Sequence, residues 1–132
     1  MALTEAERAY LTTQRLGRLA TLAPDGTLQN SAVGVHYNDE LGTIEVYGRD
    51  LGNSRKFTNV EATGEVSFIV DDIASLDPWK VRGIEIRGRA EALRDQTPPS
   101  PYFSPEIIRI HPRKIFSWGI EPGATGMVKR II

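Results

Sequence analysis

Positively charged side chains cluster in one segment, residues 47–59, whose sequence is YGRDLGNSRKFTN. Arg49 precedes a turn rich in Gly, Asn and Ser, and Arg55 and Lys56 follow it. Such turns favour helix N-termini, where the first backbone N–H groups have no acceptor inside the helix and attract anions. The segment therefore predicts a site for a phosphate ester, to which Ser54 could add its hydroxyl. The alternative is a capped surface helix whose basic side chains are simply solvated.

A strand and a helix must hold this turn in place. Alternating residue types predict a strand over residues 43–49, and the helix is expected over residues 55–62, with Gly64 placed to end it. Another helix is expected over residues 4–14, because these open with Thr-Glu-Ala-Glu, a capping-box sequence.

Most of the remaining chain has the pattern of strands separated by turns. These further strands are predicted at residues 18–23, 28–37, 66–70, 84–92 and 106–118, the last of them broken or bulged at Pro112. Residues 84–92 alternate most clearly, so one face of that strand is expected to be buried and the charged face wet. Residues 97–101 are proline-rich and predict a surface loop, and the tail after Pro122 could form one more short strand.

The pattern indicates a mainly β protein. We expect a six-stranded antiparallel β-barrel, split and flanked by short helices, because closure of a sheet removes most exposed strand edges. With 132 residues, 40% apolar and 25% charged, the chain matches one soluble domain, residues 1–132.

Composition excludes several kinds of site. The sequence has no cysteine, so it has no disulfide, thiolate metal site or cysteine nucleophile. Its two histidines, His36 and His111, are far apart, and no metal site is predicted. A net charge of -1 argues against a nucleic-acid-binding surface. No apolar run reaches the roughly 18 residues of a membrane helix, and the first ten residues do not resemble a signal peptide. A cytoplasmic protein without membrane contact is expected.

The order of these motifs resembles that of the pyridoxamine 5'-phosphate oxidase-like superfamily, the split β-barrels that bind FMN or the deazaflavin coenzyme F420. The resemblance rests on the following segments: residues 17–22 (GRLATL), the turn at 24–26 (PDG), residues 47–59 with their Ser-Arg-Lys run, residues 65–68 (EVSF) and residues 86–90 (IRGRA). It covers most of the chain. Residues 109–119 (RIHPRKIFSWG) are similar to the ending of small actinobacterial-type members assigned to F420.

The resemblance implies cofactor-binding residues in two segments: Tyr47, Gly48, Arg49, Asn53, Ser54, Arg55 and Lys56 in the first, and Asn30, Ser31, Ala32 and Val33 in the second. Arg55 and Lys56 would hold the cofactor phosphate, and the second segment would run beneath the ring system. Pyridoxamine phosphate oxidases carry an Arg and a Lys at the positions of Asn30 and Val35. Their absence here argues against vitamin B6 oxidation and leaves the F420 branch.

The implied activity is that of an F420-dependent oxidoreductase, which transfers a hydride between the deazaflavin and a small unsaturated organic substrate. The alternatives are an FMN-dependent oxidoreductase and a flavin- or deazaflavin-binding protein without turnover. No acid–base dyad is apparent, so no catalytic residue is assigned, and Tyr37, Tyr47, His36 and solvent all stay open as proton donors.

The family also implies a homodimer with two cofactor sites at the interface, each built from both chains. The expected partners are a second copy of the chain and a small-molecule substrate, with no nucleic acid and no membrane. Trp79 and Trp118 are expected in the core or at the dimer interface, with a place over the cofactor as the alternative.

Overall fold

A computed structural model describes residues 3–132, which form two α-helices, one 3₁₀ helix and eight strands. In chain order these are α1 (Glu5–Thr12), β1 (Leu16–Leu22), β2 (Leu28–Gly34), β3 (Tyr37–Asn38), β4 (Thr43–Val46), η1 (Leu51–Asn53), α2 (Arg55–Ala62), β5 (Glu65–Leu76), β6 (Trp79–Leu93), β7 (Ile107–Trp118) and β8 (Met127–Ile131). The signal-peptide expectation also covered residues 1–2, which lie outside the described residues.

Both helices form where local chemistry predicts them. At α1 the Thr4 hydroxyl accepts from the Glu7 amide at 3.1 Å, and the Glu7 carboxylate accepts from the Thr4 amide at 2.8 Å, so the capping box is confirmed. Helix α2 begins and ends at the predicted residues, with Ser54 as its N-cap. Gly64 follows it with a φ of +71°, a conformation that glycine adopts without strain.

The eight strands belong to one antiparallel sheet, in the order β2-β1-β5-β6-β7-β4-β3. β4 pairs with residues 108–110 of β7, and β8 pairs with residues 114–118 of the same strand. The mainly β fold is therefore confirmed, but the predicted number of six strands is wrong. One added strand is β8, in the tail. The other is β3, because the single strand predicted over residues 28–37 is divided into β2 and β3.

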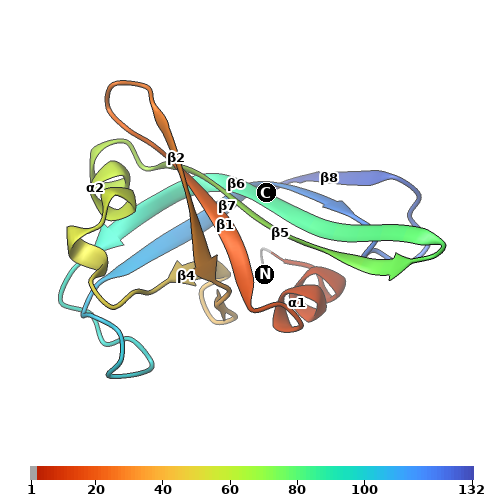
Figure 1. Cartoon of the computed structure of the whole chain (residues 1–132), viewed down its shortest axis with the longest axis horizontal. Coiled ribbons are helices and arrows are strands. Elements are labelled where there is room, and N and C mark those ends of the chain that lie inside the picture. The colour runs from red at the N-terminus through yellow and green to blue at the C-terminus, as the bar shows by residue number, and fades with distance from the viewer. Residues whose placement is uncertain (1–2) are drawn as a thin grey trace.

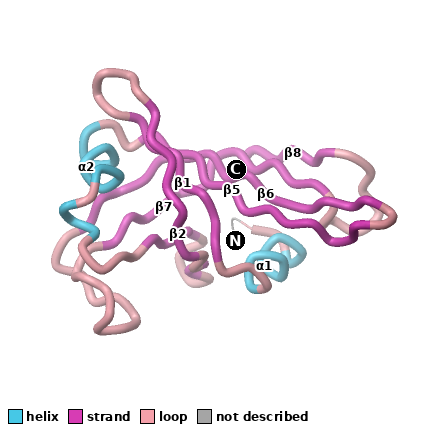
Figure 2. The backbone as a smooth tube through the Cα atoms, viewed as in Figure 1, coloured by secondary structure: helices cyan, strands magenta, loops and turns pink. Residues whose placement is uncertain are grey.

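The separation of β2 from β3 shows how the sheet curls. The Val35 amide still donates to the Arg15 carbonyl beside β1, at 3.2 Å. One residue later, the His36 carbonyl accepts from the Glu45 amide of β4, at 2.8 Å. The chain thus passes from one end of the strand order to the other within two residues. This requires the two edges to lie side by side, as in a split barrel (Figures 1 and 2).

Strands β5 and β6 are longer than predicted and form an extended hairpin. The pairing continues from Val70 and Ile84 outward to Leu76 and Trp79. Polar residues such as Asp72 interrupt the apolar alternation there, which is why the pattern ended early. In the structure Asp72 pairs with Arg82 across the hairpin at 2.8 Å. Figure 1 shows this hairpin projecting at the end of the molecule opposite α2.

Strand β7 continues through Pro112, where a break or bulge was expected. The pairing of β6 with β7 shifts register between Arg87 and Gly88, so the bulge is confirmed. A Cβ on Gly88 would lie 2.1 Å from the His111 carbonyl oxygen, so only glycine allows this close approach of the two strands. Strand β4, in contrast, ends at Val46 rather than at the predicted residue 49.

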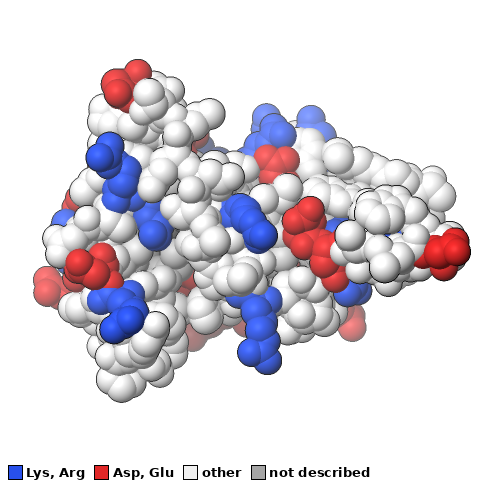
Figure 3. Space-filling model, in the orientation of Figure 1, with Lys and Arg blue, Asp and Glu red and all other residues white. Residues whose placement is uncertain are grey.

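The core lies inside the curled sheet. One row of cross-strand neighbours, Leu19, Phe68, Ile86 and Ile115, is fully buried. On the other face of β6, Arg87, Arg89 and Glu91 are exposed and Glu85 is half-buried, as the alternation predicted. Basic and acidic side chains are interspersed over the face of the molecule seen in Figure 3. Neither helix in the described part of the chain is long and apolar enough to cross a membrane.

Candidate cofactor site

The turn from Tyr47 to Lys56, here called the cofactor turn, connects β4 to α2. Its second half holds itself together. The Ser54 hydroxyl accepts from the Phe57 amide at 3.3 Å and donates to the Leu51 carbonyl at 2.6 Å. The backbone and side-chain amides of Asn53 both donate to Asp50. Ser54 therefore acts as the helix cap, with its hydrogen used inside the turn, and Asn53 orders the turn through Asp50.

The first half of the cofactor turn is held by the loop between β6 and β7, residues 94–106. The Gly48 carbonyl accepts from the Ser104 amide at 2.8 Å and from the Ser104 hydroxyl at 3.0 Å. The Leu51 amide donates to the Ser104 hydroxyl at 2.9 Å, and the Gly52 amide donates to the Glu106 carboxylate at 2.9 Å. The amides of Leu51 and Gly52 are thus already used.

The start of α2 offers two backbone donors to an anion. Arg55 and Lys56 are the first two residues of α2, so their N–H groups have no acceptor within the helix. Ser104 and Glu106 were missed from the sequence because they lie about fifty residues downstream of their partners and form no motif with them.

The cofactor turn carries three basic side chains. Within residues 3–132, Arg49, Arg55 and Lys56 form no ion pair with a carboxylate. The Arg49 guanidinium lies over the ring of Tyr102, 5.1 Å from its centroid. Uncompensated cations at a helix start suit a phosphate, so the residues present fit the anionic part of the predicted cofactor.

Arg55 connects the cofactor turn to the hairpin of β1 and β2. The pKa of Asp25 in that hairpin is lowered, first by hydrogen bonds from Thr27 and then, among smaller causes, by the charge of Arg55. Arg55 also lines a surface groove of about 340 Å³ between α2 and the hairpin, together with Leu28 and Gln29. The structure therefore brings Arg55 next to the beginning of β2.

The residues predicted on β2 divide between its two faces. Asn30 and Ala32 are exposed, whereas Ser31 is half-buried on the inner face. Val33 is only 6% exposed and packs in the core. Strand alternation makes this division unavoidable, so only Asn30 and Ala32 offer their side chains to a cofactor lying on the outer face.

A second groove, of about 380 Å³, adjoins this face of β2. Leu28 lines both grooves, and Ala20, which pairs with Asn30, lies in the wall of the larger one. Three cations and one carboxylate also line it: Arg87, Arg113, Lys114 and Glu65. Arg87 is paired with Glu85 at 2.8 Å. From the sequence, Arg87 was expected on a solvated face, and no role was predicted for Arg113 or Lys114. Their meeting depends on the register of β6 and β7 across the bulge, which no local pattern encodes.

Aromatic rings gather where the cofactor turn leaves β4. The Tyr47 ring lies 4.8 Å from that of His36 and 5.2 Å from that of Phe103, and Tyr102 packs edge-on against Phe103. Burial lowers the pKa of His36, which favours the neutral imidazole. The pKa of Tyr47 is raised by burial and then by the Glu45 carboxylate, so its hydroxyl keeps its proton.

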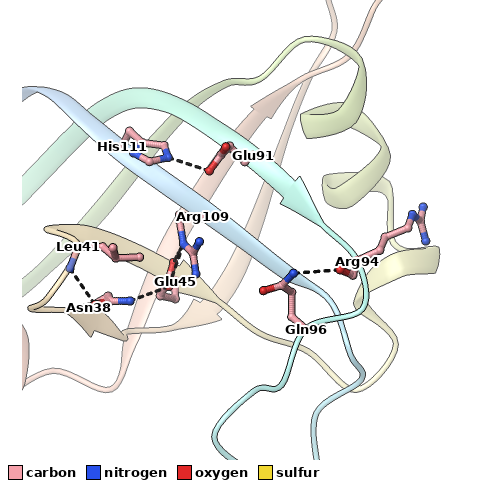
Figure 4. Close-up of polar contacts among 8 residues, drawn as sticks. All are labelled: Asn38, Leu41, Glu45, Glu91, Arg94, Gln96, Arg109 and His111. Carbon is pink, nitrogen blue, oxygen red and sulfur yellow. Dashed lines mark hydrogen bonds and ion pairs between the residues drawn. The ribbon is translucent and has the colours of Figure 1, made fainter.

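An ion pair with a buried carboxylate anchors β4, the strand that precedes Tyr47 (Figure 4). Glu45, which is 3% exposed, accepts from Arg109 of β7 at 3.0–3.1 Å and from the side chain of Asn38 at 3.1 Å. The same view shows His111 bonded to Glu91 at 2.9 Å, an exposed contact that gives His111 a structural role.

The predicted site residues therefore form three groups. Tyr47, Gly48 and Arg49 face the 94–106 loop, Arg55 faces the β1–β2 hairpin, and Asn30 and Ala32 lie on the outer face of the sheet. Figure 1 shows α2, the 94–106 loop and the β1–β2 hairpin at the same end of the molecule.

Neither tryptophan lies in the core. Trp79 is 63% exposed on the projecting hairpin. Trp118 is half-buried and lies on Gly83, where a Cβ would come within 2.4 Å of its ring. Both rings belong to the outer face of the sheet, so their place at a dimer interface stays a prediction.

Comparison with known proteins agrees with this architecture. Residues 3–119 match the family model described as pyridoxamine 5'-phosphate oxidase. A 5a,11a-dehydrotetracycline/5a,11a-dehydrooxytetracycline reductase from Streptomyces rimosus is 46% identical over 125 residues, which cover 92% of this chain and 86% of the relative.

Two solved structures show the same fold. An F420 reductase is similar with a TM-score of 0.65 and 23% identity, covering 86% of this chain and 98% of its own. An FAD-binding protein from Mesorhizobium loti has a TM-score of 0.65 and 21% identity, covering 87% of this chain and 93% of its own. The chain belongs to the pyridoxamine 5'-phosphate oxidase family of split β-barrels, and its similarity to a named reductase supports an oxidoreductase activity.

Proposed function

We propose that this protein is a cytoplasmic, F420-dependent oxidoreductase that reduces an activated carbon–carbon double bond of a small organic molecule. The observation that carries the choice of cofactor is the distribution of charge. Arg49, Arg55 and Lys56 form no ion pair in the described part of the chain, and a groove with further cations begins beside them. F420 carries a phosphodiester followed by carboxylates, so it offers anionic groups over a longer distance than the single terminal phosphate of FMN.

The choice of reaction is supported by the reductase of Streptomyces rimosus, whose name places a double bond between two ring carbons of its substrate. Reduction of such a bond adds a hydride to one carbon and a proton to the other. When bound, the reduced deazaflavin supplies the hydride.

The chain's own groups would bind and orient the cofactor and the substrate and would exclude water from the site. Lys56, Arg55 and the first N–H groups of α2 would hold the phosphate, and Asn30 and Ala32 would face the cofactor from β2. Of the candidate proton donors, His36 and Tyr47 lie in the aromatic cluster. Tyr37 instead lines a groove beside α1 with Arg8 and Leu11, so it is the weaker candidate.

The apo-protein should bind F420 about tenfold more tightly than FMN at low salt, the effect of one or two additional exposed ion contacts. The difference should shrink when the salt concentration rises from roughly 10 mM to 1 M, because the Debye length falls from about 30 Å to about 3 Å. Fluorescence titrations with both cofactors at both salt concentrations measure this. Tighter binding of FMN at low salt, or its stoichiometric copurification, would replace F420 by FMN in the proposal.

The proposal includes a homodimer whose cofactor sites lie at the interface. Apolar side chains on the outer face of the sheet remain exposed, among them Leu28 at 79%, Leu76 at 74% and Trp79 at 63%. Leu76 and Trp79 pair across the projecting hairpin, and an exposed apolar patch on a soluble protein marks an interaction site. Leu28 lies in the wall of both grooves, at the opposite end of the sheet (Figure 1).

Light scattering at micromolar concentration should therefore give about twice the chain mass of 14.6 kDa. Leu76→Glu should shift the protein to the monomer, because it places a charge among the apolar side chains of the hairpin. Leu41→Glu, in the turn between β3 and β4, is the control, since Leu41 is also exposed and should leave the mass unchanged. A wild-type protein that stays monomeric at all concentrations would contradict the proposal that two chains share each cofactor site.

A further inference from the structure

The 94–106 loop touches the cofactor turn at five places, one of which is the contact between the rings of Phe103 and Tyr47. It bonds to the Gly48 carbonyl, the Leu51 amide and the Gly52 amide, and the ring of Tyr102 lies beneath the Arg49 guanidinium. These contacts all involve the first half of the cofactor turn. Ser54 and Asn53 hold the second half together.

The first half of the cofactor turn depends on these contacts. The Leu51 amide and the Gly48 carbonyl both bond to Ser104 of the loop. Leu51 is 1% exposed, so water cannot easily replace a lost partner there. A buried amide without an acceptor costs free energy comparable to a lost hydrogen bond. The loop is therefore what keeps this backbone in its observed conformation.

The Ser104 hydroxyl has a particular role among these contacts. It accepts from the Leu51 amide at 2.9 Å and donates to the Gly48 carbonyl at 3.0 Å, so one oxygen bridges the end of β4 and the start of η1. The two residues between the bridged positions are Arg49 and Asp50. The bridge thus fixes the segment from which the Arg49 side chain extends, and Tyr102, two residues before Ser104, contacts its guanidinium.

The loop is itself well anchored. The Gln96 amide donates to the Pro105 carbonyl at 2.9 Å and closes the loop at its base. The Gln96 side chain bonds to the Arg94 carbonyl at 3.0 Å (Figure 4). The Arg94 guanidinium lies 4.8 Å from the ring centroid of Phe57 and bonds to Glu61 at 3.2 Å, and both partners belong to α2. One end of the loop therefore contacts α2, and the other end contacts the cofactor turn.

We propose that Ser104 is a positioning residue of the cofactor site. Its hydroxyl holds Gly48 and Leu51 in the geometry that presents Arg49 to the cofactor phosphate. The inference rests on the proposed function, because it assumes that this turn binds the phosphate of a flavin or deazaflavin. Ser104 acts through the backbone and touches no ligand itself.

The experiment compares Ser104→Ala and Ser104→Thr with the wild-type protein. The first readout needs no cofactor: hydrogen exchange at the Leu51 amide should become at least about tenfold faster in Ser104→Ala, because its acceptor is lost. In Ser104→Thr, which keeps the hydroxyl, exchange should return close to the wild-type rate. The second readout is the dissociation constant for F420 and for FMN, expected to rise on the order of tenfold in Ser104→Ala and to recover in Ser104→Thr.

Thr13→Ala is the matched control. The Thr13 hydroxyl donates to the Tyr10 carbonyl at 2.6 Å at the end of α1, so this variant also loses a side-chain bond to the backbone, away from the cofactor turn. It should change neither Leu51 exchange nor cofactor affinity. A general loss of stability would instead change Leu51 exchange and cofactor affinity alike in Ser104→Ala and Thr13→Ala.

The outcomes separate this inference from the proposed function. If the wild-type protein binds F420 or FMN, and Ser104→Ala binds it equally well, the positioning role is overturned and the proposed function stands. The positioning role is likewise overturned if Ser104→Thr fails to recover affinity while its Leu51 exchange is normal. If the wild-type protein binds neither cofactor, the proposed function fails, and the inference fails with it.

Discussion

Lys56→Ala is expected to weaken cofactor binding by about 10- to 150-fold, a loss of about 1.5–3 kcal/mol that corresponds to one charge-assisted hydrogen bond. Lys56 is the second residue of α2 and is half-buried, with no carboxylate bonded to its ammonium group in the described structure. Its charge is therefore free to act on a ligand together with the helix start. Arg55→Ala should have a smaller effect, because the Arg55 side chain is exposed and water screens it.

Isothermal titration of each variant with F420 and with FMN measures the effect. Lys56→Arg keeps the charge and should keep most of the affinity. Thr58→Ala, two residues further along the same helix, removes an exposed, uncharged side chain and should bind as the wild type does. Unchanged affinity in both Lys56→Ala and Arg55→Ala would exclude this turn as the anion site.

The second large effect concerns stability. Arg130→Met is expected to lower the free energy of unfolding by about 3–5 kcal/mol, as when one partner of a buried ion pair is removed. The Glu7 carboxylate is 0% exposed and receives Arg130 at 2.6 and 3.1 Å. Without the guanidinium, the buried carboxylate keeps, among residues 3–132, only its bond from the Thr4 amide. The pair also connects α1 to β8, elements more than a hundred residues apart.

Urea denaturation followed by circular dichroism gives the unfolding free energy. Arg113→Met is the control, since Arg113 is exposed and has no ion-pair partner among residues 3–132. The double variant Glu7→Gln/Arg130→Met should recover part of the loss, because the neutral amide is cheaper to bury than the carboxylate. A loss below about 1 kcal/mol in Arg130→Met would mean that water or another group compensates Glu7.

Features set by local chemistry were predictable from the sequence. The capping box at Thr4 and Glu7 and the span of α2 each depend on residues within a few positions of one another, so their signal is intact in a single chain. Ser54 caps α2 with the hydroxyl that was expected to contact the phosphate. The family resemblance also rested on such short segments, and the match over residues 3–119 confirms it.

Features set by distant contacts were not predictable. The split between β2 and β3 follows from closure of the barrel, because residues 28–38 have one continuous strand-like pattern. Ser104 contacts the cofactor turn from more than fifty residues away. Arg113 and Lys114 meet Arg87 only because the strand register brings them to one groove. In each case the neighbour is chosen by a long-range pairing, which leaves no periodicity in the sequence.

The strand order also has a consequence for how the chain is made. Strand β4 pairs with β3 and with β7, whose residues 108–110 are translated more than sixty residues after it. The cofactor turn likewise waits for Ser104 and Glu106. A nascent chain therefore carries Ile44 and Val46 without their β7 neighbours, and the Leu51 and Gly52 amides without their acceptors, until residues 104–110 have left the ribosome. Chains that stop before the 94–106 loop would therefore expose this apolar strand to chaperones or aggregation and would leave the first half of the cofactor turn without the loop that holds it.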